Sequence, residues 1–295
     1  MMDQRPTTSE TIPTISALAA QSPTMREMLQ PQDNNSSKVN DKRMRRLYLQ
    51  ATSQQWFAPT RIHFDDGVTE LDQMDPEKKR ILIKFNRIFY TLEKMGLTTI
   101  QYMMPKAVTK LKSQEAELYL SCQGFDEARH VFTIEAYLRK LGAPPVYDRK
   151  LHKFSQIASG GPYRVENWLF STLFSENFAS TFLRLYKAAN TDPIGVEMCR
   201  QLLVDESRHL HFLHSVLPDI LDRLSVFGRT YVKASQYFIM KFTESISRTL
   251  TEEGAYVGID RRTLLEESFE NVERAYENFG VTRDFLWFPQ IKTQH

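Results

Sequence analysis

The sequence predicts an all-α protein, because two of its features favour helices and two others disfavour sheets. Apolar residues recur at three- to four-residue steps, as in the series Ile81, Phe85, Ile88 and Leu92. Residues that begin and end helices flank such segments. Val, Ile and Thr do not alternate strictly between turns, and the 295 residues include only 11 glycines. We therefore expect one helical domain over residues 41–295, with four long central helices.

The segment before this domain has a different composition. Residues 1–40 are rich in Thr, Ser, Pro, Gln and Asn. Such a segment cannot bury enough apolar surface to order itself, so we expect a mobile N-terminal arm. Residues 47–74 mix aromatic and turn-forming residues. This stretch is expected to wrap around the helical body.

The first two long helices have clear boundaries. Asp75 is a good N-cap, and Pro76 fits the first helical position. Pro105 should kink or end this first helix. The second helix is expected at residues 114–141, where the Gly-Ala-Pro-Pro sequence that follows stops it.

The next helices are expected at about residues 162–190 and 192–217, with Pro218 breaking the latter. Two further helical stretches are expected at about 219–250 and 261–279. Because a loop joins the second long helix to the third, we expect these two to be antiparallel. The third and fourth are expected to be antiparallel for the same reason.

Composition narrows the class of protein. Apolar residues make up 41% and charged residues 25%, as in ordinary globular proteins. A net charge of +2 is too small to indicate nucleic acid or an acidic membrane surface as the main partner. The two cysteines form no disulfide framework, and we find neither a signal peptide nor an apolar run of about 20 residues for a membrane span. We expect a soluble cytoplasmic protein.

The pattern Asp-Glu-x-Arg-His occurs twice, at residues 126–130 and 205–209. Within each copy the Glu and the His are three residues apart, so both lie on one face of a helix. Two such faces turned toward each other supply half of the ligands of a dinuclear carboxylate site in a helical bundle. Mixed carboxylate and imidazole ligands suit iron or manganese. The predicted metal ligands are Glu127, His130, Glu206 and His209.

The aspartates of the repeat have a predicted role beside the metals. A metal-bound imidazole commonly donates its other N–H to a carboxylate. Asp205 could serve His130 in this way, and Asp126 could serve His209. Arg129 and Arg208 could neutralise these carboxylates, with surface exposure of the arginines as the alternative. Flanking apolar residues, Phe125 and Val204 among them, are expected to face inward.

Two further glutamates are needed, one from each of the other central helices. On the first helix, Glu93 lies in an apolar segment where an unpaired carboxylate is costly, and it is a better ligand than terminal Glu77. On the third helix, Glu176 lies nearer the middle than Glu166 does. Glu176 is therefore preferred, and Glu166 remains the alternative.

These residues give the chain a resemblance to known proteins. With the lead-in Trp-Phe-Ala-Pro-Thr-Arg-Ile-His-Phe at residues 56–64, residues 56–214 resemble the ferritin-like dinuclear carboxylate superfamily. The resemblance is closest to the ribonucleotide reductase small subunit and its ligand-binding oxidase relatives. It implies a ferritin-like four-helix bundle core with additional helices, and a homodimer. The doubled pattern is also similar to bacterial diiron monooxygenases, in which a hydroxyl residue lies four places after the third-helix glutamate. Ser180 occupies that place here.

The chain departs from the resembling families at several positions. Ile134 stands where reductase subunits carry a radical-storing tyrosine. Gly96 and Ser171 stand where ligand-binding oxidases carry a Val–Tyr crosslink, and Leu202 stands where arylamine N-oxygenases carry an extra histidine. Two other phenols, Tyr90 and Tyr119, are candidates for a redox-active or substrate-facing role.

The preferred hypothesis is an O₂-activating non-haem diiron oxidase or oxygenase. Two iron ions, or a manganese/iron pair, would hydroxylate, desaturate or N-oxygenate a small organic substrate. An apolar pocket is expected one turn from the ligands, lined by Phe89, Leu97, Phe178 and Leu213. Because no flavin or nicotinamide fingerprint is visible, electrons should come from an external donor, a ferredoxin or a reductase. The alternative is a radical-generating protein similar to the ribonucleotide reductase small subunit. An iron store is disfavoured, because storage cages are built from shorter chains.

Overall fold

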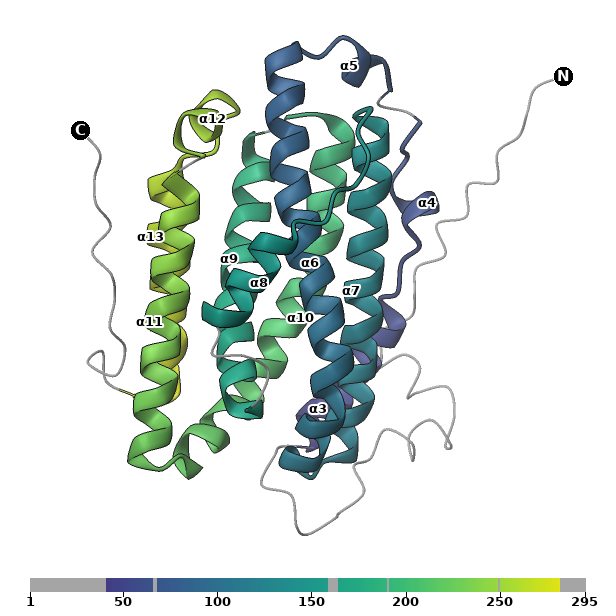
Figure 1. Ribbon diagram of the computed structural model, residues 1–295. Helices are drawn as coiled ribbons and strands as arrows, with labels where there is room; N and C mark the ends of the chain where they lie inside the picture. The colour runs from purple at the N-terminus through teal and green to yellow at the C-terminus, as the bar shows by residue number, and fades with distance from the viewer. Residues whose placement is uncertain (1–40, 66–67, 159–163, 190, 249, 282–295) are drawn as a thin grey trace, which may run out of the picture.

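The computed structural model describes residues 41–65, 68–158, 164–189, 191–248 and 250–281, and the arm expected at residues 1–40 lies outside them. Regular secondary structure in this part of the chain is helical throughout, which confirms the all-α class. Four long helices lie side by side as a central bundle (Figure 1). They are α6 (Pro76–Leu111), α7 (Gln114–Lys140), α9 (Val165–Ala189) and α10 (Pro193–Arg223).

Capping residues fix where three of these helices begin. The Asp75 carboxylate accepts a hydrogen bond from the backbone N–H of Lys78 at 2.8 Å, at the start of α6. Ser113 caps α7 and Asp192 caps α10 in the same way. Each cap satisfies a backbone donor that a helix start would otherwise leave without a partner. The predicted start of the first helix at Asp75 and Pro76 is therefore confirmed.

Two prolines lie inside helices rather than at their ends. Helix α6 continues past Pro105 to Leu111, and α10 continues past Pro218 to Arg223, so the expected break at Pro218 is wrong. An interior proline costs about 3 kcal/mol because one backbone hydrogen bond is lost and its ring crowds the preceding turn. Apolar side chains on both sides of each proline are buried in the core. Their burial outweighs that local cost.

Helices α7 and α9 are parallel, so the antiparallel arrangement expected for them is wrong. Lys110 near the end of α6 pairs with Glu166 at the start of α9, with 2.5 Å between Nζ and Oε1. At the other end of the bundle, the hydroxyls of Tyr137 and Tyr186 lie 3.1 Å apart near the C-terminal ends of α7 and α9. The described residues between these two helices include α8 (Arg149–Ala158), and α9 begins at the same end of the bundle as α7. Helices α9 and α10 are antiparallel, as expected.

The remaining helices cover the bundle. Helix α3 (Asp41–Ser53) packs on α7 and α10, where the sequence predicted only an irregular wrap. Helices α11 (Val226–Arg248) and α13 (Arg261–Asn278) pack on α9 and lie beside each other in Figure 1. The short helices are α4 (Ala58–Arg61), α5 (Val68–Asp72) and α12 (Thr251–Tyr256).

The core consists of two apolar clusters with a polar layer between them. One cluster contains residues such as Ile100, Tyr119 and Phe212, and the other contains residues such as Phe89 and Ile134. On each central helix the sequence passes from one cluster to the other. Between the two clusters, the central helices carry buried acidic, basic and histidine side chains. This middle layer is where the structure positions the candidate site.

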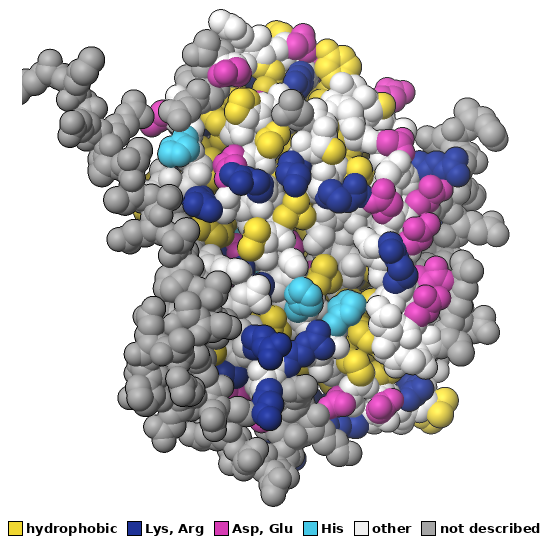
Figure 2. Space-filling model, turned by 180° about the vertical axis from the view of Figure 1, so that it is seen from behind, with side chains coloured by type: hydrophobic (Ala, Val, Ile, Leu, Met, Phe, Trp, Pro, Cys, Tyr) yellow, Lys and Arg dark blue, Asp and Glu magenta, His cyan; other side chains and the backbone are white. Residues whose placement is uncertain are grey.

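The outer surface of the bundle is mixed in character. On the face opposite to that of Figure 1, Lys and Arg side chains are interspersed with acidic and hydrophobic ones (Figure 2). This fits the net charge of +2. Among the described residues, no helix combines the length and the apolar composition that crossing a membrane requires.

Candidate metal centre

The two Asp-Glu-x-Arg-His repeats direct their polar residues into the bundle. Asp, Glu, Arg and His at positions i, i+1, i+3 and i+4 share one side of a helix, and all eight side chains of the two copies are buried. Phe125 and Val204, which precede the repeats, are 58% and 44% exposed, so the expectation that they face inward is wrong. The inward positions are already taken by the charged groups.

Six side chains converge in the polar layer: the Glu and His of each repeat, together with Glu93 and Glu176. Ligand atoms of Glu93, Glu127 and His130 all lie within 4.8 Å of one another. Atoms of Glu127, Glu176 and His209 satisfy the same condition. The two groups share Glu127 and come from all four central helices. Their arrangement offers two adjacent positions for metal ions with one carboxylate between them.

Glu206 lies between the two histidines. Its Oε2 is 3.1 Å from Nδ1 of His209, and its Oε1 is 3.5 Å from Nδ1 of His130. One oxygen therefore faces each predicted metal position. The Nδ1 atom of His130 is also 3.0 Å from Oε2 of Glu93, and the two imidazole ring centres are 6.0 Å apart.

The structure distinguishes the alternatives that the sequence left open for the other glutamates. Glu176 Oε1 is 3.6 Å from Nδ1 of His209 and is part of the convergent group. Glu166 instead pairs with Lys110 at the end of the bundle. Glu93 is buried in the group, whereas Glu77 is half exposed and pairs with Arg80.

Crowding of buried carboxylates changes their protonation. Burial, together with the nearby charge of Glu176, raises the pKa of Glu206 to about 8. Burial and the charge of Glu93 raise the pKa of Glu127 well above its usual value. Burial opposes charge on His130, yet hydrogen bonds with Asp205 and Glu93 raise its pKa well above the usual value. Without metal ions, protons bound to these glutamates and histidines offset negative charge that bound cations would neutralise.

The donor set fits a pair of divalent ions. Four carboxylates and two neutral imidazoles carry four negative charges, which two divalent cations would balance. Oxygen and nitrogen donors in this mixture suit iron and manganese. The same six residues are those that the sequence predicted as ligands, and their role in binding metal stays a prediction.

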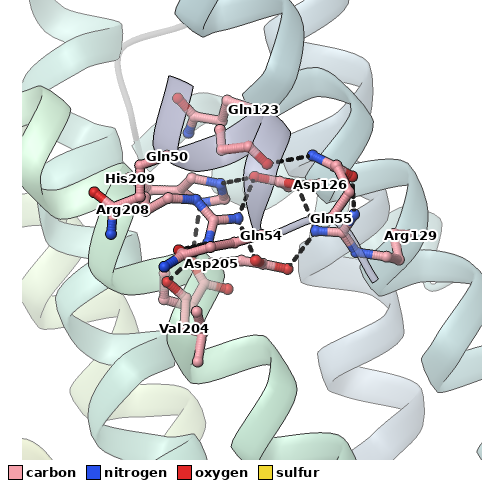
Figure 3. Close-up of polar contacts among 12 residues, drawn as sticks. Gln50, Gln54, Gln55, Gln123, Asp126, Arg129, Val204, Asp205, Arg208 and His209 are labelled. Atoms are coloured by element: carbon pink, nitrogen blue, oxygen red, sulfur yellow. Dashed lines mark hydrogen bonds and ion pairs between the residues drawn. The ribbon is translucent and has the colours of Figure 1, made fainter. Parts of the chain in front are cut away.

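A closed set of four charged side chains lies beside this group, and we call Asp126, Arg129, Asp205 and Arg208 the Asp–Arg ring. Figure 3 shows the two aspartates between Arg208 on one side and Arg129 on the other. Arg129 Nη2 donates to Asp126 at 2.5 Å and to Asp205 at 2.6 Å. Arg208 Nη2 donates to Asp126 at 3.1 Å and also to Asp205. Both arginines are buried, so the neutralising role is favoured over surface exposure.

The Asp–Arg ring contacts the histidines crosswise. Nε2 of His130 is 3.2 Å from Asp205, and Nε2 of His209 is 3.5 Å from Asp126. Each aspartate therefore lies by the histidine of the other repeat, in the arrangement that the sequence suggested. An N–H held on Nε2 leaves the lone pair on Nδ1 directed at the carboxylate group, where a metal would bind.

Residues of the segment that follows α3 contact the Asp–Arg ring. Gln54 and Gln55 accept hydrogen bonds from Arg208 and Arg129 respectively (Figure 3). Trp56 donates its indole N–H to Asp205 at 2.9 Å, and the Arg129 guanidinium lies 4.6 Å from the centre of the Trp56 ring. These contacts satisfy buried charge and connect a half-buried indole to His130 through Asp205.

A cavity of about 290 Å³ borders the carboxylate group on one side. Glu93, Glu127 and Glu176 line it, together with aromatic side chains such as Phe89 and Phe178. Its walls come mainly from α6, α9 and α11. Of the expected pocket residues, Leu97 and Leu213 are not among the lining residues. The cavity gives a small molecule access to the candidate metal positions from the apolar side.

The predicted catalytic side chains do not line this cavity. Ser180 is half-buried on α9 and is absent from the lining. Tyr90 is buried in an apolar cluster, where its hydroxyl lies 3.4 Å from Nζ of Lys94. Their catalytic roles stay predictions. Tyr119 is fully buried and stacks on Phe212 with 4.8 Å between ring centres.

Two residues that the sequence analysis did not single out reach the site or its cavity. Gln123 donates to Oε1 of Glu176 at 3.3 Å and lines the cavity. Its position one turn before Glu127 on the ligand-bearing face of α7 was a usable signal. Arg261 also lines the cavity, from the start of α13. No sequence signal connects Arg261 to the repeats, because it comes from a different part of the fold.

Several solved structures have a fold similar to that of this chain. The chain is similar to a protein with aldehyde deformylating oxidase activity from Synechococcus, with a TM-score of 0.59 and 19% identity over 71% of this chain and 94% of that one. It is similar to an R2-like ligand-binding oxidase variant with a Mn/Fe cofactor, with a TM-score of 0.63 and 17% identity over 81% of this chain and 97% of that one. It is also similar to an R2-like ligand-binding oxidase variant with an Fe/Fe cofactor, with a TM-score of 0.62 and 17% identity over 81% of this chain and 93% of that one. At these identities the likeness shows the fold alone.

Sequence comparison identifies the family. No curated protein matches the chain. The sequence profile of the family described as P-aminobenzoate N-oxygenase AurF matches residues 55–276, well over half of the chain and inclusive of the six convergent residues. The chain therefore belongs to the P-aminobenzoate N-oxygenase AurF family.

Proposed function

We propose that this protein is an O₂-dependent oxidoreductase with two metal ions held by Glu93, Glu127, His130, Glu176, Glu206 and His209. The observation that carries the proposal is the pair of buried ligand groups sharing Glu127. Membership of an N-oxygenase family and the Fe/Fe and Mn/Fe centres of proteins with this fold support two iron ions, or a manganese/iron pair. When bound, such a pair supplies O₂ activation.

The protein contributes orientation and exclusion of water. Glu127 and Glu206 would help to hold the ions, and Asp205 and Asp126 lie 3.2 Å and 3.5 Å from Nε2 of His130 and His209. The apolar clusters above and below the polar layer exclude bulk water from the site. Gln123 fixes one oxygen of Glu176 at the edge of the cavity.

The cavity limits the substrate to a small organic molecule with an apolar body. Its 290 Å³ is roughly twice the ~150 Å³ of a cavity known to hold benzene. Among the described lining residues, Arg261 is the only basic one. It donates to Ser247 Oγ at 3.0 Å and to the Glu244 carbonyl at 3.2 Å, and no carboxylate oxygen of the described residues lies within salt-bridge distance. We include a carboxylate in the proposed substrate class, consistent with the family's named substrate, p-aminobenzoate.

Hydroxylation, desaturation and N-oxygenation are all open to such a centre. Leu202 is fully buried in an apolar cluster, so this family member does not offer the extra histidine of arylamine N-oxygenases at that position. The reaction type is therefore not fixed by family membership. Dependence on an external electron donor stays a prediction, and the Trp56–Asp205–His130 contacts provide a connected route to the site. The homodimer and the cytoplasmic location also stay predictions.

The alternative function is radical generation for nucleotide reduction. Ile134 is fully buried in an apolar cluster and provides no phenol. Tyr137, the nearest tyrosine along the helix, donates its hydroxyl to Asp192 at 2.5 Å. A mixed manganese/iron pair would have to replace the tyrosine. Restoration of ribonucleotide reduction on mixing with a reductase large subunit would favour this alternative.

The test is anaerobic loading with Fe(II), followed by O₂, with absorption and Mössbauer spectroscopy and metal analysis. We expect about two iron ions per chain and a change of both spectra on exposure to O₂. Glu127→Ala and His209→Ala should lose metal while helical content by circular dichroism is retained. Glu166→Ala is the matched control, because Glu166 lies at the end of the bundle, and it should load normally. Normal iron content in both ligand variants would overturn the proposal.

A further inference from the structure

We propose that Gly96 is a positioning residue that reserves the space occupied by the Glu127 carboxylate, and this inference rests on the proposed metal site. Helices α6 and α7 pack against each other, and Glu127 reaches from α7 across to α6 at Gly96. A Cβ added to Gly96 would lie 2.7 Å from Oε2 of Glu127 and 3.3 Å from its Cδ. Real Cβ atoms do not approach other atoms so closely, so any side chain at position 96 displaces this carboxylate.

The backbone at Gly96 does not need glycine. Its φ is negative, as in the rest of α6, whereas the described glycines with positive φ are Gly142, Gly258 and Gly280. After proline, glycine is the least favourable residue in a helix interior. Gly96 therefore weakens α6 locally without serving a turn or a cap. The close approach of the Glu127 carboxylate explains why glycine occupies position 96.

Glu127 depends on this space more than its neighbours do. Glu93 and Glu206 each contact a histidine at 3.0–3.1 Å, and Glu176 accepts a hydrogen bond from Gln123 at 3.3 Å. Among the described residues, the nearest potential donor to Glu127 is Nδ1 of His209, at 3.8 Å, which exceeds hydrogen-bond distance. No donor from the described residues holds this carboxylate. The wall at Gly96, against which its Oε2 lies, is the close contact that limits where it can be placed on the α6 side.

Gly96 and Glu127 both line the cavity. The space over Gly96 is therefore continuous with the space that would receive a substrate. Glu127 is also the one carboxylate common to both groups of metal-binding atoms. Displacing it would disturb both metal positions, so a methyl group at residue 96 should act on the metals without acting on the fold.

The test compares Gly96→Ala with Gly124→Ala. Gly124 is also in the interior of a central helix, but a Cβ there meets only Ile100 Cγ2 at 3.8 Å, an ordinary contact. Both substitutions should preserve or raise the thermal midpoint of the metal-free protein, because alanine favours helix. Gly96→Ala alone should weaken Mn(II) and Fe(II) binding, by roughly tenfold or more in apparent Kd, as loss of a ligand-orienting contact does.

A double-mutant cycle with Glu127→Asp makes the cause specific. The aspartate is one methylene shorter and withdraws the carboxylate from residue 96, so Gly96→Ala should weaken binding less in that background than in the wild type. If the wild type binds no metal pair, the proposed function fails, and this inference fails with it. If the wild type binds two ions and Gly96→Ala binds them equally well, the inference alone is overturned.

Discussion

At the scale of the residue, burial and crowding determine how the six candidate ligands hold protons. Glu206 has its pKa raised to about 8 by burial and by the charge of Glu176. Its carboxyl therefore holds a proton below that pH in the metal-free protein, and a metal ion must displace the proton to bind. His130 and His209, whose pKa values are raised well above the usual value, contribute in the same direction.

We expect metal uptake to release protons and to strengthen as pH rises toward 8. The sign follows because protonation, favoured below the raised pKa, competes with the cation, whereas above that pH Glu206 is already ionised. Proton release on adding Mn(II) can be measured with an indicator dye in weak buffer, and affinity can be measured by titration at about pH 6.5 and pH 9. Affinity that does not change between these pH values would contradict the assignment of Glu206 as a ligand.

At the scale of the element, tyrosine hydroxyls connect helices through their capping residues. Tyr137 on α7 donates to Asp192, the N-cap of α10, at 2.5 Å, and both groups are buried. Tyr256 at the end of α12 donates to Asp75, the N-cap of α6, at 2.8 Å, but this tyrosine is 57% exposed. Water can replace a lost partner only in the second pair.

Tyr137→Phe should lower the free energy of unfolding by about 1–3 kcal/mol, because the Asp192 carboxylate loses a buried donor. Tyr256→Phe removes the same kind of contact at the surface and should leave stability almost unchanged. Chemical denaturation of the two metal-free variants beside the wild type measures the difference. Equal destabilisation by both substitutions would show that burial does not govern the strength of these contacts.

At the scale of the whole molecule, packing of α11 and α13 against α9 creates a cavity that the four-helix bundle alone would not enclose. Arg261 at the start of α13 lines this cavity together with the candidate ligands Glu93, Glu127 and Glu176. Arg261 is the one basic residue among the described residues that line this largely apolar cavity, and the proposed substrate class of organic acids rests on it.

The metal-loaded protein should accordingly bind p-aminobenzoate more tightly than aniline, which has the same ring and amine but no carboxylate. Arg261→Met should remove this preference and weaken p-aminobenzoate binding by roughly tenfold or more, the effect of losing one charged hydrogen bond. Arg262→Met is the control, since Arg262 is exposed and pairs with Glu266. Both affinities are measurable by calorimetry. A preference that survives in Arg261→Met would exclude Arg261 as the anchor.

The sequence by itself determined the helical class, the start of the first long helix at its N-cap Asp75, and the six residues that the structure brings together. These follow from local spacing, because a helix places residues i and i+3 on one face whatever surrounds it. It could also rank Glu93 above Glu77, because a carboxylate in an apolar segment needs partners, and Glu176 above Glu166, because Glu176 lies nearer the middle of its helix.

The tertiary structure alone decided several other features. Helices α7 and α9 are parallel, α10 continues through Pro218, and Phe125 and Val204 face outward. The tertiary structure also brought Gln123 to Glu176, set Gly96 against Glu127, and placed Arg261 at the cavity. The reason is physical. Contacts between helices depend on how whole helix faces pack and how much apolar surface they bury. The free energy of this burial is a sum over residues that are far apart in the chain.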